Sequence, residues 1–324
     1  MSDRRRILSV DGGGVRGIIP AAVLAALERT TDKPAREHFD FLAGTSTGAV
    51  IAAALATGIP AERLVTLYER RGPELFRSVP GLKFLKRLFT GKMYDVATLN
   101  RMLGEELGEH AGWQMNDVPN DILVTAKGLD DGHQWYFVKD RPDLNSGRTG
   151  RLLLTDCVTA SAAAPTYFGP WPVPSLGLLV DGGTGVAGNP TYQACVEAFE
   201  FTKAYEPANT VVVSLGTGRF LNRPRPTWLL SWLEWILSEL LRSPGEQQTE
   251  LVQRHYAAAA FYRIDARLPH DFPLDTVGAG LKELRKFGED LAAQVDWPAI
   301  LRGDEESFRV GPRKVHAEAY ARAV

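Results

Sequence analysis

Short apolar runs alternate with glycine-rich segments along this chain. Runs typical of buried strands occupy residues 6–10, 39–43, 122–126, 134–138, 176–180 and 210–215. Stretches with helical character lie at 18–29, 49–56, 155–164, 190–203, 228–241, 246–260 and 276–294. A repeated order of strand, loop and helix favours a parallel sheet covered by helices. We therefore predict a three-layer α/β/α fold with a mainly parallel central sheet.

The composition sets the class of protein. Of 324 residues, 44% are hydrophobic and 23% are charged, enough apolar surface for a large core. Lys and Arg number 37 against 39 Asp and Glu, so the net charge of −2 argues against dominant disorder and against binding a nucleic-acid polymer through bulk positive charge. Two cysteines cannot build a disulfide framework.

Targeting and domain signals point to a cytoplasmic protein. The first residues, MSDRRRILSVDGGG, hold no apolar signal region, and no uninterrupted apolar run reaches the roughly 20 residues that span a bilayer. We expect one domain over residues 1–324, with its motifs within 6–218 and a helical C-terminal part at 219–324.

The second predicted strand ends in Gly44-Thr45-Ser46-Thr47-Gly48, which fits the pattern G-x-S-x-G. A serine on a tight strand-to-helix turn is held exposed, and the flanking glycines avoid steric conflict. The following helix start favours developing negative charge. Ser46 is thus a candidate nucleophile, although a tight turn with a capping hydroxyl would have the same pattern.

The first predicted strand is followed by DGGGVRG. Three consecutive glycines let backbone N–H groups approach a ligand closely, as an oxyanion hole requires. The segment also fits the dinucleotide pattern G-x-G-x-x-G at Gly12, Gly14 and Gly17, with Glu37 or Asp40 spaced as a ribose-binding acid. A serine turn elsewhere in the chain favours the oxyanion hole.

A nucleophilic serine needs a base, and none of the six histidines lies in a glycine-rich or strand-end setting. Asp181 does, in the segment LVDGG. An ordinary aspartate has a pKa near 3.9 and needs desolvation or a hydrogen bond to act as a base. A turn aspartate before two glycines is the alternative. Cys157 and Cys195 fall in predicted helices and are expected to be buried thiols.

These motifs in this order, DGGGVRG, GTSTG and DGG, resemble the patatin-like phospholipases, bacterial type. The segments Ala160-Ser161-Ala162-Ala163-Ala164-Pro165 and Ser214-Leu215-Gly216-Thr217-Gly218 also look like parts of that family, so the resemblance covers residues 6–218. One departure is Gly188-Asn189-Pro190, where family members often have Asn-Asn-Pro.

The resemblance implies the patatin-like fold and a Ser–Asp dyad at the carboxyl edge of the sheet, with no catalytic histidine and no metal or cofactor. The implied roles are Ser46 as nucleophile, Asp181 as base, Gly12, Gly13 and Gly14 as oxyanion amides, Arg16 as support for that loop, and Gly44 and Gly48 as the elbow. It also implies a serine hydrolase of the phospholipase A or lysophospholipase type that cleaves acyl esters of phospholipids through an acyl-serine.

Three alternatives remain open. The same dyad could serve an acyltransferase or a general esterase. Some bacterial relatives are phospholipase effectors of phage defence that cyclic oligonucleotides activate. The third alternative is not an enzyme: the chain could be a nucleotide-binding module that uses the first glycine loop.

Two segments are suited to a membrane surface. The stretch from Phe76 to Tyr94, FRSVPGLKFLKRLFTGKMY, interleaves five cations with apolar residues and holds no acid. The stretch from Trp228 to Leu241, WLLSWLEWILSELL, is apolar except for a narrow polar stripe and is too short to span a bilayer. Each could instead pack on the core, and the second could form an oligomer interface. We expect peripheral contact with the inner membrane.

Overall fold

The structure, a computed structural model, describes residues 4–76, 92–141, 149–220, 226–227, 229–265 and 267–304. Within the helix that begins at residue 229, it does not describe the side chains of residues 229, 230, 233, 234 and 236–244. Most of the stretch from Phe76 to Tyr94 therefore lies outside the described residues, as does Trp228.

Within the residues that the structure describes, eight strands form one sheet. Their bounds are β1 Arg5–Val10, β2 Phe41–Gly44, β3 Asp121–Gly128, β4 Gln134–Val138, β5 Trp171–Val173, β6 Gly177–Asp181, β7 Thr210–Leu215 and β8 Ala260–Ile264. The order is β5-β6-β3-β2-β1-β7-β8, and β4 pairs with β3. Strands β3, β2, β1, β7 and β8 are parallel, whereas β4 and β6 run antiparallel to β3. The predicted, mainly parallel sheet is confirmed.

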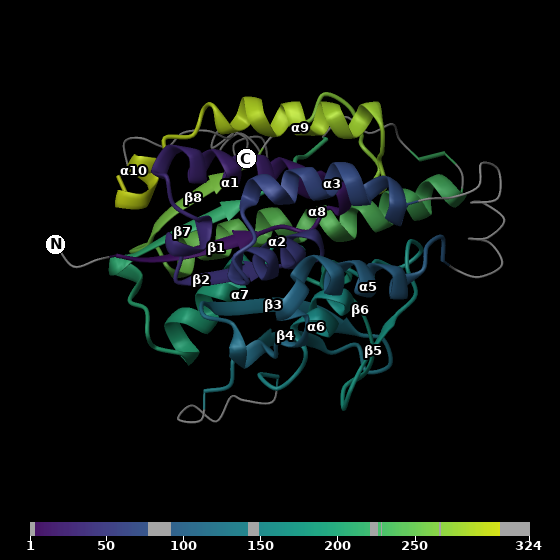
Figure 1. Ribbon diagram of the computed structural model, residues 1–324, viewed down its shortest axis with the longest axis horizontal. Coiled ribbons are helices and arrows are strands. Elements are labelled where there is room, and N and C mark those ends of the chain that lie inside the picture. Colours follow the sequence, from purple (N-terminus) through teal and green to yellow (C-terminus); the bar gives the residue numbers. More distant parts are fainter. Residues whose placement is uncertain are drawn as a thin grey trace, which may run out of the picture.

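Helices cover both faces of this sheet, which confirms the three-layer fold (Figure 1). Their bounds are α1 Ile18–Thr31, α2 Thr47–Ala56, α3 Ala61–Leu75, α5 Val96–Leu107, α6 Leu154–Ser161, α7 Thr191–Val196, α8 Leu229–His255, α9 Ala279–Ala292 and α10 Trp297–Arg302. Helices α1 and α2 pack on one face, with α3 and α9 outside them, and α7 and α8 pack on the other. No helix in the described part of the chain is both long and apolar enough to cross a membrane.

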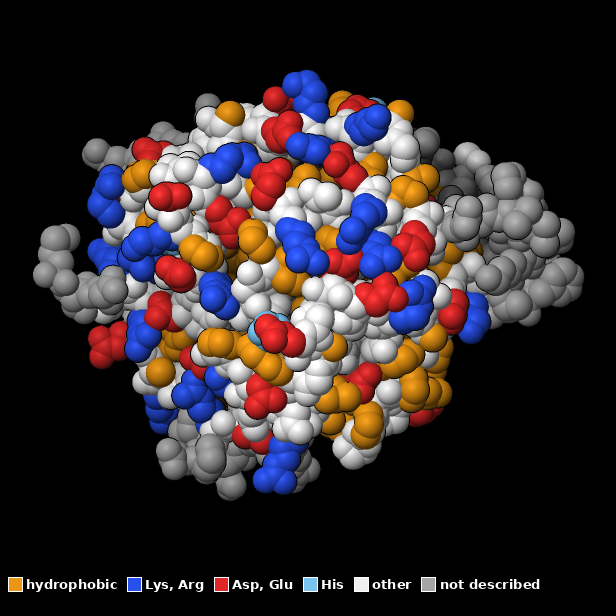
Figure 2. Space-filling view, in the orientation of Figure 1, with side chains coloured by type: hydrophobic (Ala, Val, Ile, Leu, Met, Phe, Trp, Pro, Cys, Tyr) orange, Lys and Arg blue, Asp and Glu red, His pale blue; other side chains and the backbone are white. Residues whose placement is uncertain are grey.

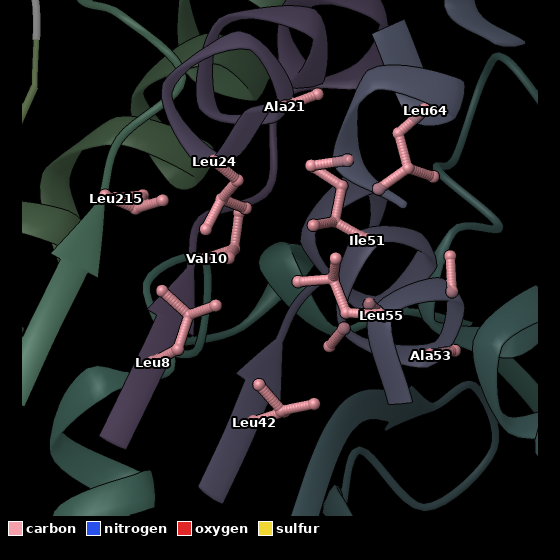
Figure 3. Packing of buried hydrophobic residues seen from close by; sticks show 14 of the residues in the cluster. Leu8, Val10, Ala21, Leu24, Leu42, Ile51, Ala53, Leu55, Leu64 and Leu215 are labelled. Atoms are coloured by element: carbon pink, nitrogen blue, oxygen red, sulfur yellow. The ribbon is translucent and has the colours of Figure 1, made fainter. Parts of the chain in front are cut away.

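The core follows from the alternation of side chains along the strands. Leu8 and Val10 of β1 lie with Leu42 and Leu215 against α1 and α2 (Figure 3). Ile7, on the opposite face of β1, packs with residues of α7 and α8. Strand β7, with the sequence TVVVSL, is buried at all six positions, as expected for a central strand covered on both faces.

The C-terminal third differs from its prediction. The sequence predicted two helices, at 228–241 and 246–260, but one helix, α8, runs through Pro244. Val252, in the last turns of α8, packs in the core of the face that α8 covers. The alanine run at 257–260 suggested helix, yet β8 begins at Ala260 and pairs with β7, so this third is not wholly helical.

Other elements were predicted less completely. The helix expected at 190–203 is α-helical only over Thr191–Val196 and continues as a wider π-helical turn over Glu197–Phe201. Pro190 is at the N-cap, the position just before the first helical residue. The sequence reading missed α3 and α5, which border the candidate site.

Acidic and basic side chains alternate over the molecular surface shown in Figure 2. Several are paired between helices: Arg71 of α3, for example, contacts Glu106 of α5 at 2.9 Å. This mixture fits the net charge of −2 and leaves no broad patch of one sign on this face.

Candidate active site

Ser46 stands on the sharp turn between β2 and α2. Its φ of 55° lies in the left-handed region, which is rare for a residue other than glycine. The turn is tight: a Cβ on Gly44 would lie 2.2 Å from the Gly48 carbonyl oxygen, and one on Gly48 would lie 2.1 Å from the Val10 carbonyl oxygen. The Ser46 N–H donates to Ser161 Oγ at 2.8 Å, which anchors the turn to the end of α6.

An antiparallel strand brings Asp181 to this turn. Strands β2 and β6 lie end to end along the same side of β3. Gly44 of β2 pairs with Val124, and Asp181 of β6 pairs with Ala126, two residues further on. Strand β4 occupies the other side of β3. Because β6 runs against β3, its last residue meets the end of β2, and Asp181 therefore lies beside Ser46.

Asp181 is 1% exposed. Burial raises the pKa of its carboxyl from 3.8 to about 6, and hydrogen bonds from the Ser46 hydroxyl and the Gly183 N–H oppose this rise. The Gly183 N–H donates to Asp181 Oδ1 at 2.8 Å. A carboxylate with a pKa near 6 is mostly ionised at pH 7 and is a stronger base than an ordinary aspartate, as a general base requires.

The backbone N–H groups of the glycine loop differ in their hydrogen-bond partners. The Gly12 N–H donates to the Gly188 carbonyl at 2.9 Å, so it is not available to a substrate, and the prediction of Gly12 as an oxyanion donor is corrected. Within the described residues, the N–H groups of Gly13 and Gly14 have no hydrogen-bond partner. Gly14 has a φ of 58°, and a Cβ there would lie 2.4 Å from the Leu274 carbonyl oxygen. Glycine is therefore required at this position.

Arg16 contacts the backbone of two loops. Its Nε donates to the Gly13 carbonyl at 3.3 Å and its Nη1 to the Gly218 carbonyl at 3.5 Å. The side chain therefore ties the glycine loop to the loop after β7. The family resemblance implies that Arg16 supports the glycine loop, and that role stays a prediction.

The structure contradicts the dinucleotide alternative. Asp40 precedes β2, at the opposite edge of the sheet from the glycine loop, where it accepts hydrogen bonds from Arg5 Nη1 at 2.5 Å and the Arg6 N–H at 2.8 Å. Glu37 lies in the turn just before it. Neither acid can reach a ribose at the loop that begins at Gly12.

A buried ion cluster supports the first residue of the glycine loop. Arg263 of β8 donates to both carboxylate oxygens of Asp11, at 2.9 and 2.5 Å, and to Asp265 Oδ2 at 3.1 Å. Burial lowers the pKa of Arg263, but the two carboxylates raise it overall, so the guanidinium stays protonated. A single arginine in the apolar strand AFYRI is the sequence signal that could have indicated such a partner.

An apolar cavity opens at Ser46 and extends between α2, α3 and α5. Its volume is about 160 Å³, and it is partly open to solvent. Residues on its wall include Val50, Ala54, Leu67, Leu103, Phe168 and Leu274. The charged residues on its wall, Arg71 and Glu106, bind each other. A wall of this composition is suited to an aliphatic chain.

A comparison with models of known protein families identifies the family of this chain. Residues 8–195 match the family model described as "Patatin-like phospholipase". The chain belongs to the patatin-like phospholipase family. The matched region contains the glycine loop, the serine turn and Asp181, so all three motifs of this patatin-like phospholipase lie within it.

Several curated proteins are similar over most of this chain. A cGAMP-activated phospholipase of Vibrio cholerae is 28% identical over 91% of this chain and 92% of its own length. A cGAMP-activated phospholipase of Pseudomonas aeruginosa is 30% identical over 89% of this chain and 87% of its own length. Human calcium-independent phospholipase A2-gamma is 28% identical over 83% of this chain and 36% of its own length. This patatin-like phospholipase is thus a lipid acyl hydrolase of the phospholipase A type.

The histidines that the structure describes in this patatin-like phospholipase are engaged elsewhere. His38 bonds to Thr31, His255 to Tyr192 and His270 to Glu283. The rings of His110 and His133 contact Trp113 and Trp135; His316 lies outside the described residues. Both cysteines are buried free thiols, as predicted.

Some residues that shape the site were not assigned a role from the sequence. Ser161 holds the nucleophile turn, and it lies in a segment that the family resemblance had marked. Thr45 Oγ1 bonds to Thr125 Oγ1 at 2.8 Å and to the Ala187 carbonyl at 2.5 Å, which joins the serine turn to β3 and to the segment after Asp181. These partners are distant in the sequence, so no local pattern indicates them.

Proposed function

We propose that this chain hydrolyses fatty-acyl esters of phospholipids or lysophospholipids through an acyl-enzyme on Ser46, with Asp181 as the general base. The observation that carries the proposal is the arrangement of three features. Ser46 lies on a strained turn, a buried carboxylate of raised pKa lies beside it, and an apolar cavity opens at the same point.

The reaction has two steps that both use Asp181. First, the Asp181 carboxylate takes the Ser46 proton as Oγ attacks the ester carbonyl carbon. The N–H groups of Gly13 and Gly14 stabilise the oxyanion. The ester C–O bond then breaks, and the proton passes from Asp181 to the leaving alcohol, which yields acyl-Ser46. In the second step a water gives its proton to Asp181 and attacks the acyl carbon. Ser46 recovers the proton as the fatty acid leaves.

The test is a lipidomic comparison of phospholipid vesicles treated with wild type, Ser46→Ala and Asp181→Asn. We expect fatty acid and lysophospholipid from wild type only, with both variants folded. Ser175→Ala and Asp290→Asn make the same changes at exposed positions and should retain activity. Near-normal turnover by Ser46→Ala would refute the proposal. Acyl groups recovered on an added alcohol instead of as free acid would identify an acyltransferase.

We propose that the start of α8 forms a membrane-contacting surface. Trp232 and Trp235 are 47% and 37% exposed, and their rings meet edge to face with centroids 5.7 Å apart. Exposed tryptophans favour the polar–apolar boundary of a bilayer. Replacing both by Ala should weaken vesicle binding but leave hydrolysis of a soluble ester unchanged. Phe201→Ala, which removes another exposed aromatic ring (52% exposed), is the matched control.

We also propose that a cyclic dinucleotide activates the enzyme. Two bacterial relatives named cGAMP-activated phospholipase align with about nine-tenths of this chain. Vesicle hydrolysis should then be low for the protein alone and rise at least tenfold when cGAMP is added. Equal rates with and without cGAMP would refute activation and leave the hydrolase proposal intact.

A further inference from the structure

The glycine loop lies between two other loops because of the strand order. Strand β1 pairs with β2 on one side and with β7 on the other. The three strands are parallel, so their following loops meet at the same edge of the sheet. The loop after β2 contains Ser46, and the loop after β7 contains Thr217. The glycine loop therefore has the nucleophile on one side and Thr217 on the other.

Thr217 binds the glycine loop directly. Its hydroxyl donates to the Gly12 carbonyl at 2.8 Å. The side chain is 5% exposed and lies flush against the loop: a Cβ on Gly13 would be 2.2 Å from Thr217 Oγ1. On the opposite side, a Cβ on Gly12 would be 3.3 Å from Ser46 Cβ. The loop is thus in close contact with both neighbours.

The planarity of the peptide bond connects this contact to catalysis. The Gly12 carbonyl and the Gly13 N–H belong to one trans peptide, so they point in opposite directions. Because Thr217 holds the carbonyl towards the β7 side, the Gly13 N–H points towards the β2 side, where Ser46 lies. Arg16 acts in the same way on the next peptide. Its side chain binds both the Gly13 carbonyl and the loop after β7. Because the Gly13 carbonyl and the Gly14 N–H belong to one peptide, this contact also sets the direction of the Gly14 N–H.

A glycine-flanked peptide needs such an anchor. With glycine on both sides, few steric limits fix the orientation of the Gly12–Gly13 peptide plane, so it can rotate at low cost. A rotated plane would turn the Gly13 N–H away from the reacting carbonyl. Preorganised donors are effective in catalysis because they need no reorientation during the reaction.

We propose that Thr217 is a positioning residue for the acyl transfer, because its hydroxyl aims the Gly13 N–H at the oxyanion. It acts through the loop and touches no substrate. The inference rests on the proposed function, with Ser46 as the nucleophile. It extends the oxyanion site beyond the DGGGVRG motif to a residue more than 200 positions away.

The test compares Thr217→Val, which keeps the shape and removes the hydroxyl, with Thr217→Ser, which keeps the hydroxyl. The assay is hydrolysis of a soluble short-chain ester, with cGAMP added if wild type requires it. Loss of one oxyanion donor costs about 10²–10³-fold in kcat, so a misdirected donor should cost about tenfold to hundredfold, with KM within about twofold. Thr217→Ser should recover most of kcat.

Thr210→Val is the matched control. Thr210 begins β7, the strand that leads into the loop of Thr217; it is 1% exposed, and its hydroxyl donates to the Glu206 carbonyl at 2.7 Å. Thr210→Val should lower the free energy of unfolding in urea by about as much as Thr217→Val does, and it should keep wild-type kcat. The rate of labelling by a fluorophosphonate probe measures the attack by Ser46 independently of turnover, and Thr217→Ala replaces the valine variant if that one does not fold.

The outcomes separate the two proposals. Wild-type kcat in folded Thr217→Val, or an equal fall in kcat for Thr210→Val, would overturn the positioning role while Ser46→Ala remains inactive. Activity in Ser46→Ala would overturn the proposed function itself. A fall in kcat confined to Thr217→Val and Thr217→Ala, with recovery in Thr217→Ser, supports the positioning role.

Discussion

Asp181→Asn should stabilise the folded protein while it abolishes the activity. The carboxylate is buried in a site that favours its neutral form, with a pKa of about 6 in the folded chain against 3.8 ordinarily. An asparagine has nearly the same shape. Its oxygen can accept from the Gly183 N–H and its NH₂ group can donate to Ser46, so both hydrogen bonds remain satisfied.

The size of the effect follows from the rise in pKa. At about 1.4 kcal/mol per pKa unit, a rise from 3.8 to about 6 corresponds to about 3 kcal/mol. The stability contributed by the neutral acid is fully present below pH 3.8 and is lost as the pH rises through about 6. The asparagine does not titrate, so the variant should gain on wild type over this window and exceed it by about 3 kcal/mol at pH 8.

Urea unfolding of both proteins at pH 4, 5, 6 and 8 measures this difference. We expect it to be near zero at pH 4 and close to its maximum above pH 6.5. Asp290→Asn gives the effect of removing one negative charge from the surface. A difference between Asp181→Asn and wild type that does not change from pH 4 to pH 8 would show that Asp181 is not held in a neutral-favouring site, and its suitability as a base would lose its support.

Three further predictions concern the rate, the glycine loop and the cavity. Wild-type kcat/KM for a soluble ester should rise with pH to a plateau, with its midpoint near pH 6, because the ionised form of Asp181 is the proposed base; a rate that falls with pH over this range would contradict that role. Arg263→Met leaves the buried Asp11 carboxylate without its cation, while Asp265 keeps Arg219 at 2.8 Å. The variant should lower the free energy of unfolding by about 3–5 kcal/mol in urea, whereas a loss under about 1 kcal/mol would show that the cluster is not a structural support. Val50→Trp adds bulk to the cavity wall and should reduce turnover of a long-chain ester relative to a short-chain one, and an unchanged ratio would place the acyl chain elsewhere.

Local patterns in the sequence were sufficient for the elements around the site. The strands and turns that hold Ser46, Asp181 and the glycine loop were predicted within a few residues, because short apolar runs next to glycine-rich turns have few alternative structures. The errors fell where local pattern and packing disagree. The alanine run before Tyr262 favours helix, yet the open edge of β7 takes Ala260–Ile264 as a strand. Backbone hydrogen bonds to that edge outweigh a weak local preference.

The sequence by itself determined the residue types of the site and, through the family resemblance, their expected roles. Only the tertiary structure decided which of them can act together and how. It aligned β6 against β3, so that Asp181 meets the end of β2. It also pairs the Gly12 N–H with the Gly188 carbonyl, while the N–H groups of Gly13 and Gly14 have no partner among the described residues. These outcomes depend on hydrogen bonds between segments far apart in the chain, and such bonds form only when the sheet order is set.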